Sequence, residues 1–132
     1  MHTVSFKETF EGSLENVWDL ISNLNHQLWR SNIKEVKIID ETHFIEYDKD
    51  GYETNFTITK KIDKEIYEFD IENKNINGHW IGRLKEVDNQ HVYVEFTEMI
   101  NVNNKIMNLM AKSYLKKQQK LYIEDLKKAL QR

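Results

Sequence analysis

Positions 33 to 102 constrain the fold most, because almost all of this stretch has the pattern of short strands separated by tight turns. Alternation of polar and apolar residues predicts strands over 35–40, 43–48, 52–62, 65–72, 79–87 and 91–102. Turn sequences such as Asp48-Lys49-Asp50-Gly51 and Asp88-Asn89 lie between them. Connections this short favour antiparallel neighbours, so we expect a meander.

The residues before this stretch predict one more strand and a short helix. Val4, Phe6 and Phe10 share one parity and alternate with polar residues, which predicts a strand and brings the number of strands to seven. Ser13 can then cap a helix. Its apolar residues recur at helical spacing: Leu14, Val17, Trp18, Ile21 and Leu24. A second short helical turn can hold Leu28 and Trp29.

The C-terminal residues predict a single long helix, from a cap at Asn103 or Asn104 to about Leu130. Its apolar residues form a broad stripe: Ile106, Met107, Met110, Tyr114, Leu121, Tyr122, Leu126 and Leu130. Such a helix needs a wide apolar surface to lie on, and the strands supply one. We therefore expect one α+β domain over residues 1–132, with a helix-grip fold in which a curved seven-stranded antiparallel sheet wraps around the C-terminal helix.

Composition excludes several classes of function. The 19 Lys and Arg and the 22 Asp and Glu give a formal charge of -3, so the basic field that attracts nucleic acid is missing. The absence of cysteine excludes disulfides and a cysteine nucleophile, and suits a reducing compartment. No segment resembles a secretion signal, and no apolar run approaches the roughly 20 residues that cross a bilayer as a helix. We expect a soluble, cytoplasmic protein.

No motif indicates a metal site, a nucleotide site or hydrolysis. The five histidines contain no His-x-x-x-His pair and no clustered acidic ligand: His2, His26, His43, His79 and His91. The chain also lacks a Gly-x-Ser-x-Gly elbow, a Walker loop and a dinucleotide glycine fingerprint. We expect no metal and no cofactor.

Three features carry a family resemblance: residues 4–10 (VSFKETF), residues 13–21 (SLENVWDLI), and Trp29, all followed by the long terminal helix. In this order they resemble the START/Bet v 1-like superfamily, also called SRPBCC, and its small bacterial proteins of the polyketide cyclase/dehydrase type. In that superfamily the first helix and the tryptophan after it complete the enclosure that the sheet forms around the C-terminal helix. The chain departs from the pattern in two ways, because Arg30-Ser31-Asn32 stands where a proline commonly follows the tryptophan, and no glycine-rich loop like that of the plant allergens is present.

A curved sheet cannot contact one straight helix along its whole length, so we expect an apolar cavity between the two. The residues expected to line it are Phe6, Trp29, Tyr47, Phe56, Tyr67, Phe69, Trp80, Phe96, Glu98, Met107, Met110, Tyr114 and Gln118. The tyrosine hydroxyls can orient the polar end of a ligand, and the flexible methionines suit an adaptable wall. The alternative for most of them is plain core packing.

Two glutamates interrupt apolar faces and are the candidate catalytic residues. Glu98 shares the parity of Phe96 and Ile100, and Glu8 stands between Phe6 and Phe10. The resembled topology pairs these two strands, so both carboxylates can share a face. A carboxylate in an apolar cavity has a raised pKa and can act as a general acid or base. The alternative places each glutamate at a wet rim or beside a lysine, or turns it outward at a bulge.

The strand over 79–87 leaves its inward face ambiguous. Apolarity places Trp80 and Leu84 inward, whereas a two-residue turn at Asp88-Asn89 would turn His79 inward. A bulge or an odd loop resolves the conflict in favour of Trp80. Gly82 would then leave room beside Trp80 for a ligand or for a helix side chain such as Met107 or Met110.

Three functions fit these expectations. The first is binding, for transport or sequestration, of a small hydrophobic molecule that is lipid-like, aromatic or polyketide-like, by a monomer or a homodimer. The second is a cyclase or dehydratase in which Glu98 or Glu8 moves a proton while Tyr67 or His79 orients the substrate. The third is a domain that binds a protein partner through an exposed apolar patch, and no such patch is visible in the sequence.

Overall fold

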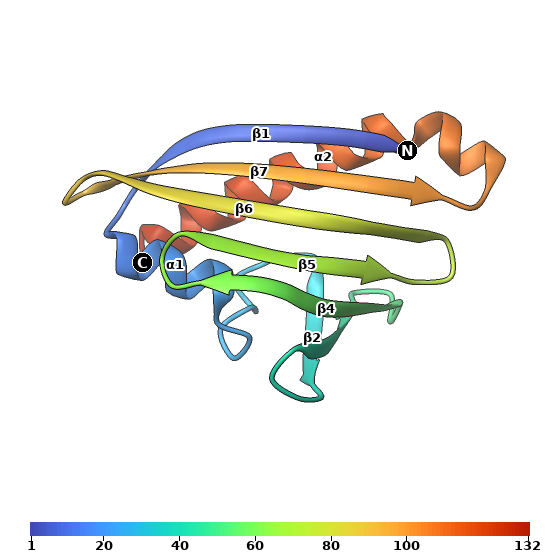
Figure 1. Cartoon of the computed structure of the whole chain (residues 1–132), viewed down its shortest axis with the longest axis horizontal. Helices are drawn as coiled ribbons and strands as arrows, with labels where there is room; N and C mark the ends of the chain where they lie inside the picture. The colour runs from blue at the N-terminus through green and yellow to red at the C-terminus, as the bar shows by residue number, and fades with distance from the viewer.

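The computed structural model describes the whole chain, Met1 to Arg132, as one sheet with two helices (Figure 1). In chain order the elements are β1 (His2–Glu11), α1 (Leu14–Ser22), β2 (Ile33–Ile38), β3 (His43–Asp48), β4 (Glu53–Ile62), β5 (Ile66–Glu72), β6 (Ile76–Asp88), β7 (His91–Val102) and α2 (Lys105–Leu130). The seven strands and the long terminal helix match the fold predicted from the sequence.

The sheet is antiparallel throughout, with the strand order β1-β7-β6-β5-β4-β3-β2. Strands β2 to β7 follow one another as a meander, and β1 pairs with β7 at one edge. Phe6 lies opposite Phe96 and Glu8 opposite Val94, as the resemblance implied. Helix α2 crosses one face of the sheet, behind the strands in Figure 1.

Helix α1 begins at its predicted cap. The Ser13 hydroxyl accepts a hydrogen bond from the Asn16 N–H at 3.1 Å. The segment over 23–32 contains turns and no second helix, and the turn closed by the Arg30 N–H donating to the Gln27 carbonyl at 3.2 Å holds Leu28 and Trp29, as expected. Side chains there bond back to the last carbonyls of α1: Gln27 donates to Leu20 and Asn23 at 2.8 Å each, and Trp29 donates to Leu20 at 3.0 Å. These bonds hold the segment as turns against the helix.

Helix α2 begins after Asn104, whose side chain accepts from the N–H groups of Ile106 and Met107. Its buried face consists of Ala111, Leu115, Gln119, Ile123, Asp125 and Leu126. This face is rotated from the predicted stripe, because α2 lies mainly against the edge strands β1 and β7. No helix in the structure has the length and the apolar composition needed to span a membrane.

The register of β6 places Trp80 inward. Trp80 lies opposite Glu98, and the pairing shifts between Glu86 and Asp88 near the hairpin tip. That bulge resolves the ambiguity as predicted, and His79 faces the other side. The room beside Gly82 is taken by the Trp80 indole rather than by a methionine, because a Cβ atom built on Gly82 would lie 2.6 Å from the ring.

Candidate functional site

The concave face of the sheet carries a connected group of aromatic rings. Trp80 stacks on Phe69 with 4.8 Å between ring centroids, and lies 5.1 Å from Phe96 and 6.1 Å from Tyr67. Phe56 lies 5.2 Å from Phe69 at a steep angle. The structure thus brings together five of the residues predicted to line a cavity.

The segment after α1 and the helix α2 close one side of this aromatic group. Trp29 packs edge-on against Tyr122 of α2 at 5.2 Å, and Tyr122 packs edge-on against Phe96 at the same distance. Phe6, on β1, is partly buried and packs against the core. Trp29 and Phe6 therefore lie at the borders of the interior, as walls shared with α2 and with β1.

A buried ion pair lies inside this apolar setting. The Arg30 guanidinium donates to both carboxylate oxygens of Glu46, at 2.6 and 3.1 Å, and stands over the Tyr122 ring at 5.5 Å from its centroid. Burial would lower the pKa of Arg30, but the charge and the hydrogen bonds of Glu46 raise it above its ordinary value. The bidentate geometry fixes the guanidinium plane, so the Nε–H, which has no protein partner, points in a defined direction.

Three buried polar atoms of the protein have no protein partner. They are the Nε of Arg30, the hydroxyl of Tyr67 and the Oε1 of Gln119. Burial and the negative charge of Glu46 raise the pKa of Tyr67, while Arg30 lowers it, and the net effect is a rise. The phenol is therefore a neutral donor. Buried polar groups are nearly always satisfied, so these atoms indicate a place where a polar guest can bind.

Glu98 faces the same interior. It stands between Val4 and Trp80 in one cross-strand row of the concave face, and Phe69 follows Trp80 in that row. Burial raises the pKa of the Glu98 carboxyl to about 7, and the charge of Arg30 lowers it by a smaller amount. A carboxyl group with this pKa is divided between its acid and base forms near neutral pH, which suits proton transfer.

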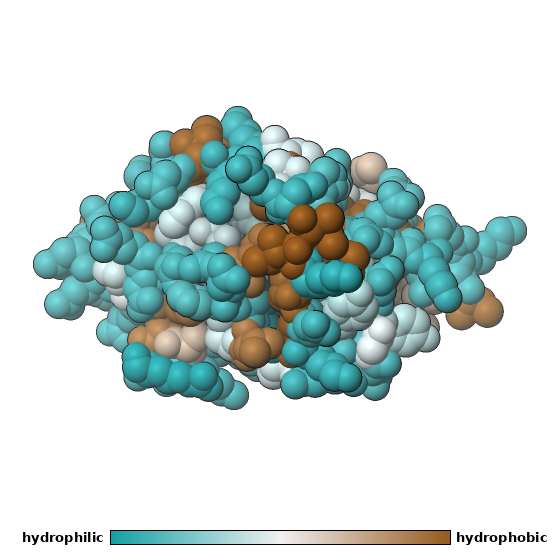
Figure 2. Space-filling model, turned by 90° about the horizontal axis from the view of Figure 1, so that it is seen from below, coloured by the Kyte–Doolittle hydropathy of each residue, from teal (hydrophilic) through white to brown (hydrophobic).

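The N-terminal part of α2 carries exposed apolar side chains, while the aromatic residues of the sheet beneath are buried. Met107, Met110 and Tyr114 are exposed rather than enclosed, so their predicted place inside a cavity has to be corrected. Burial, then the charges of Asp48 and Glu98, raise the pKa of Tyr114, so its hydroxyl lies within reach of the fields of both carboxylates. Figure 2 shows apolar surface gathered near the middle of the molecule when it is seen from the side of β2 to β4.

Tyr47 is on the wrong face for a cavity wall. Phe44 and Glu46 are the buried residues of β3, so alternation turns Tyr47 outward, where its hydroxyl donates to Glu53 at 3.2 Å. Gln118 is also displaced, because Gln119 takes the buried place on α2. Gln118 accepts a hydrogen bond from Asn32 at 3.3 Å, at the edge of the helix face.

The remaining polar candidates lie away from the interior. Glu8 is on the concave face, but its carboxylate pairs with Lys127 of α2 at 3.3 Å, which is the arrangement beside a lysine that we had considered. His79 is on the outer face, 2.7 Å from Asp70 and 3.0 Å from Glu68. Burial lowers the pKa of His79 and the two carboxylates raise it, with a net rise. His79 cannot orient a substrate in the interior.

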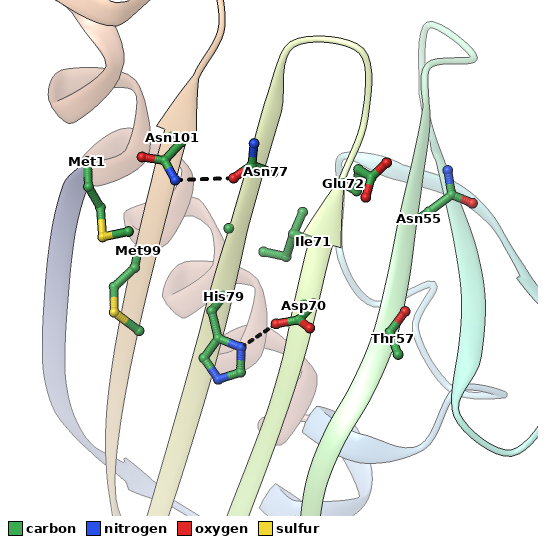
Figure 3. A pocket seen from close by; sticks show the side chains of 11 residues that line it. Met1, Asn55, Thr57, Asp70, Ile71, Glu72, Asn77, His79, Met99 and Asn101 are labelled. Carbon is green, nitrogen blue, oxygen red and sulfur yellow. Dashed lines mark hydrogen bonds and ion pairs between the residues drawn. The ribbon is translucent and has the colours of Figure 1, made fainter.

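Two surface hollows are present, and both lie outside the space between the sheet and α2. One, of about 550 Å³, is on the outer face of the sheet around His79, Asp70, Asn77, Asn101 and Met99 (Figure 3). The other, of about 470 Å³, lies beside α1 and the ends of β2 and β4. Both are shallow and mostly polar, and no group of His, Cys, Asp and Glu in the structure can hold a metal ion.

Sequence reasoning missed Arg30 and Glu46, the most polar part of the interior. Arg30 stands at the place where the resembled proteins commonly have proline, and that departure was visible. Glu46 shares the parity of Phe44, and this parity would have placed it inward. The pairing itself could not be read, because it joins a turn after α1 to a strand in the middle of the chain.

Solved structures with the same fold superpose over almost the entire chain. A START superfamily protein from Mycobacterium smegmatis matches with a TM-score of 0.87 and 11% sequence identity, over 99% of this chain and 98% of that chain. The chain has the START/Bet v 1-like fold. A conserved protein from Geobacillus kaustophilus shares this helix-grip fold with a TM-score of 0.85 and 13% identity, over 98% of this chain and 95% of that chain.

A more distant helix-grip structure contains small aromatic molecules. Norcoclaurine synthase from Thalictrum flavum, in complex with dopamine and hydroxybenzaldehyde, matches with a TM-score of 0.72 and 7% identity, over 97% of this chain and 85% of that chain. No family model matches the sequence, and no curated protein matches it either. At these identities the likeness shows the fold alone.

Proposed function

We propose that this protein binds a small amphipathic molecule between the concave face of the sheet and α2. The ligand has an apolar, preferably aromatic body and at least one hydrogen-bond acceptor. The aromatic rings of β4 to β7 would hold the body, and the polar group would lie near Arg30 and Tyr67. The fold supports this proposal, because START/Bet v 1-like proteins bind hydrophobic ligands.

One observation carries the proposal: two buried donors, the Arg30 Nε and the Tyr67 hydroxyl, have no protein partner inside an apolar interior. Leaving a buried donor unsatisfied costs about 1 to 3 kcal/mol. A carbonyl, carboxylate or phenolic oxygen of a ligand would satisfy both donors. A purely hydrocarbon ligand would satisfy neither.

We infer that the exposed apolar side chains of early α2 border the entrance for this ligand. Met107, Met110 and Tyr114 are apolar or aromatic and are exposed to solvent. Flexible methionines adapt to different ligand shapes. Transport or sequestration of the ligand in the cytoplasm, by a monomer or a homodimer, is the biological role that we propose on this basis.

The test is binding of the fluorescent probe 8-anilinonaphthalene-1-sulfonate, which has an aromatic body and an anionic acceptor. We expect Tyr67→Phe to weaken binding about two- to tenfold, the value of one hydrogen bond, without loss of stability. Tyr47→Phe removes a hydroxyl from the outer face and is the matched control. Equal affinity of both variants and the unaltered protein would show that the interior does not receive the probe's polar group.

The natural ligand can be sought by native mass spectrometry of freshly purified protein. A bound small molecule with an oxygen acceptor is expected, and its mass gives its chemical class. A bound hydrocarbon without an acceptor would contradict the role of Arg30 and Tyr67, while leaving the fold and the apolar site intact.

A second candidate function, catalysis of the cyclase or dehydratase type, rests on the Glu98 carboxyl. Its pKa of about 7 suits a general acid or base, and its place beside Trp80 puts it against the proposed ligand. With the ligand in hand, Glu98→Gln distinguishes the two functions. Catalysis predicts lost turnover at nearly unchanged affinity, whereas simple binding predicts that the ligand leaves the protein chemically unchanged in both forms.

A further inference from the structure

The first half of α2 presents apolar side chains to solvent. Ile106 is 74% exposed, Leu109 86% and Met110 66%, and Met107 and Tyr114 are also exposed. Ile106, Met110 and Tyr114 are spaced four residues apart, so they share one side of the helix. Exposed apolar groups gathered in this way mark an interaction surface, whereas isolated ones do not. We call residues 105–120 the basic apolar segment.

The charge of the basic apolar segment has a single sign. Its charged residues are Lys105, Lys112, Lys116, Lys117 and Lys120, all exposed, and it contains no Asp or Glu. The chain as a whole has a formal charge of -3, so this half-helix is a local concentration of positive charge on an acidic protein. By their spacing Lys105, Lys112, Lys116 and Lys120 fall on one side, next to the apolar side, whereas Lys117 falls between Ile106 and Met110 and Leu109 falls among the lysines.

We propose that the basic apolar segment docks on an anionic lipid surface. A helix with an apolar side and lysines on the other lies in the plane of a bilayer interface, with its apolar side among the acyl chains and its lysines at the headgroups. Each lysine near an anionic surface contributes about 1 kcal/mol. Their long stems can lie along the apolar boundary while the ammonium groups stay in water.

The fold presents this segment without obstruction. It begins at the end of the molecule opposite the β6–β7 hairpin tip (Figure 1). Its start is fixed to β1 by a hydrogen bond between His2 Nε2 and Asn108 Oδ1 at 2.6 Å, while Ala111 and Leu115 hold its other side on the domain. The segment is therefore a formed helix before it meets a surface, and docking does not require it to fold first.

A lipid surface fits better than a second copy of this chain. Two copies meeting through this segment would bring two sets of five lysines together with no acid on the segment to balance them. Anionic headgroups supply the missing negative charge over an extended plane. Docking does not depend on the proposed ligand, although it would put Met110 and Tyr114, which border the entrance, next to the lipid.

The experiment is flotation of the full chain with vesicles of phosphatidylcholine alone, or of phosphatidylcholine mixed with phosphatidylglycerol. We expect binding to the mixed vesicles and loss of binding at high salt, because salt screens the lysines. Leu109→Glu combined with Met110→Glu should reduce binding about tenfold or more, since two apolar side chains no longer enter the interface. Lys112→Glu combined with Lys116→Glu should also reduce it.

The control is Val87→Glu, which puts one glutamate, against two in the double variant, on another exposed apolar residue at the hairpin tip. It should bind vesicles like the unaltered protein. Three outcomes overturn the proposal: no flotation with either vesicle, equal loss of binding in Val87→Glu, or a dimer in sedimentation that Leu109→Glu with Met110→Glu dissociates. None of these readouts uses the interior, so a negative result does not affect the ligand proposal. Failure of the ligand proposal likewise does not affect the docking proposal.

Discussion

The two halves of α2 differ in what surrounds them. In the second half Ile123 and Leu126 are buried, Tyr122 packs on Trp29 and Phe96, and Asp125 accepts hydrogen bonds from the backbone and side chain of Ser31 at 2.8 Å each. In the first half only Ala111 and Leu115 are buried. One continuous helix is therefore a core element in its C-terminal half and an exposed surface in its N-terminal half.

The largest effect should come from the ion pair that rests on the packed half. Glu46→Gln keeps the size of the side chain but leaves the Arg30 charge buried without its counter-charge, which costs about 3 to 5 kcal/mol. Urea unfolding should show this loss. The double variant Arg30→Met with Glu46→Leu should recover most of the stability, because no buried charge remains. A loss below about 1 kcal/mol in Glu46→Gln would mean that the pair is solvated.

The next effect compares one apolar truncation in each half. Leu126 is fully buried and Leu109 is 86% exposed. Leu126→Ala should lower the free energy of unfolding by about 2 to 5 kcal/mol, because it leaves a cavity. Leu109→Ala should change it by no more than about 0.5 kcal/mol, as exposed positions do. Similar losses of unfolding free energy in both variants, measured by chemical denaturation, would mean that the first half of α2 is covered in solution. The two halves of α2 would then not differ.

A smaller, pH-dependent effect should come from Glu98, which lies on the concave face of the sheet. Its pKa rises on folding from 4.5 to about 7, so the folded state holds a proton that the unfolded state has lost between these values. Stability must therefore fall as pH rises through this window. Glu98→Gln should remove that part of the fall and stabilise the protein above pH 7 by up to about 3 kcal/mol.

The measurement is the unfolding free energy of the variant minus that of the unaltered protein, taken from pH 4 to pH 8. The contributions of the other titrating groups cancel in this difference. Glu8→Gln is the control on the same face, because the Glu8 carboxylate is partly exposed and pairs with Lys127. It should change stability by no more than about 1 kcal/mol, with no fall across the window. A flat difference for Glu98→Gln would show that water reaches the carboxyl freely.

The strands and the helix ends could be predicted because their signals are local. The Ser13 cap, the alternation in β1 and β7 and the run to Leu130 each depend on residues that are near in sequence. The inward face of β6 was predicted only as a choice between two registers, because the bulge after Glu86 depends on packing across the sheet.

The site was harder to predict than the fold, for two physical reasons. The face of α2 that packs is set by where the helix crosses the sheet, so Gln119 and Ala111 are inside while Met107 and Met110 are outside. The ion pair joins Arg30 in a turn to Glu46 in β3, and no sequence period links such distant positions. Tyr47 was expected in the cavity wall, but Phe44 and Glu46 take the inward parity of β3.

The missing side chain at Gly82 would determine how deep the proposed ligand could sit. The Trp80 indole lies flat over that bare stretch of backbone, and a methyl group there would come within 2.6 Å of the ring. Any larger residue at this position would lift the indole away from the sheet and toward Tyr122, raising the floor of the interior. Substitution at this one position is thus a simple way in which proteins with this fold could come to bind shorter or longer ligands.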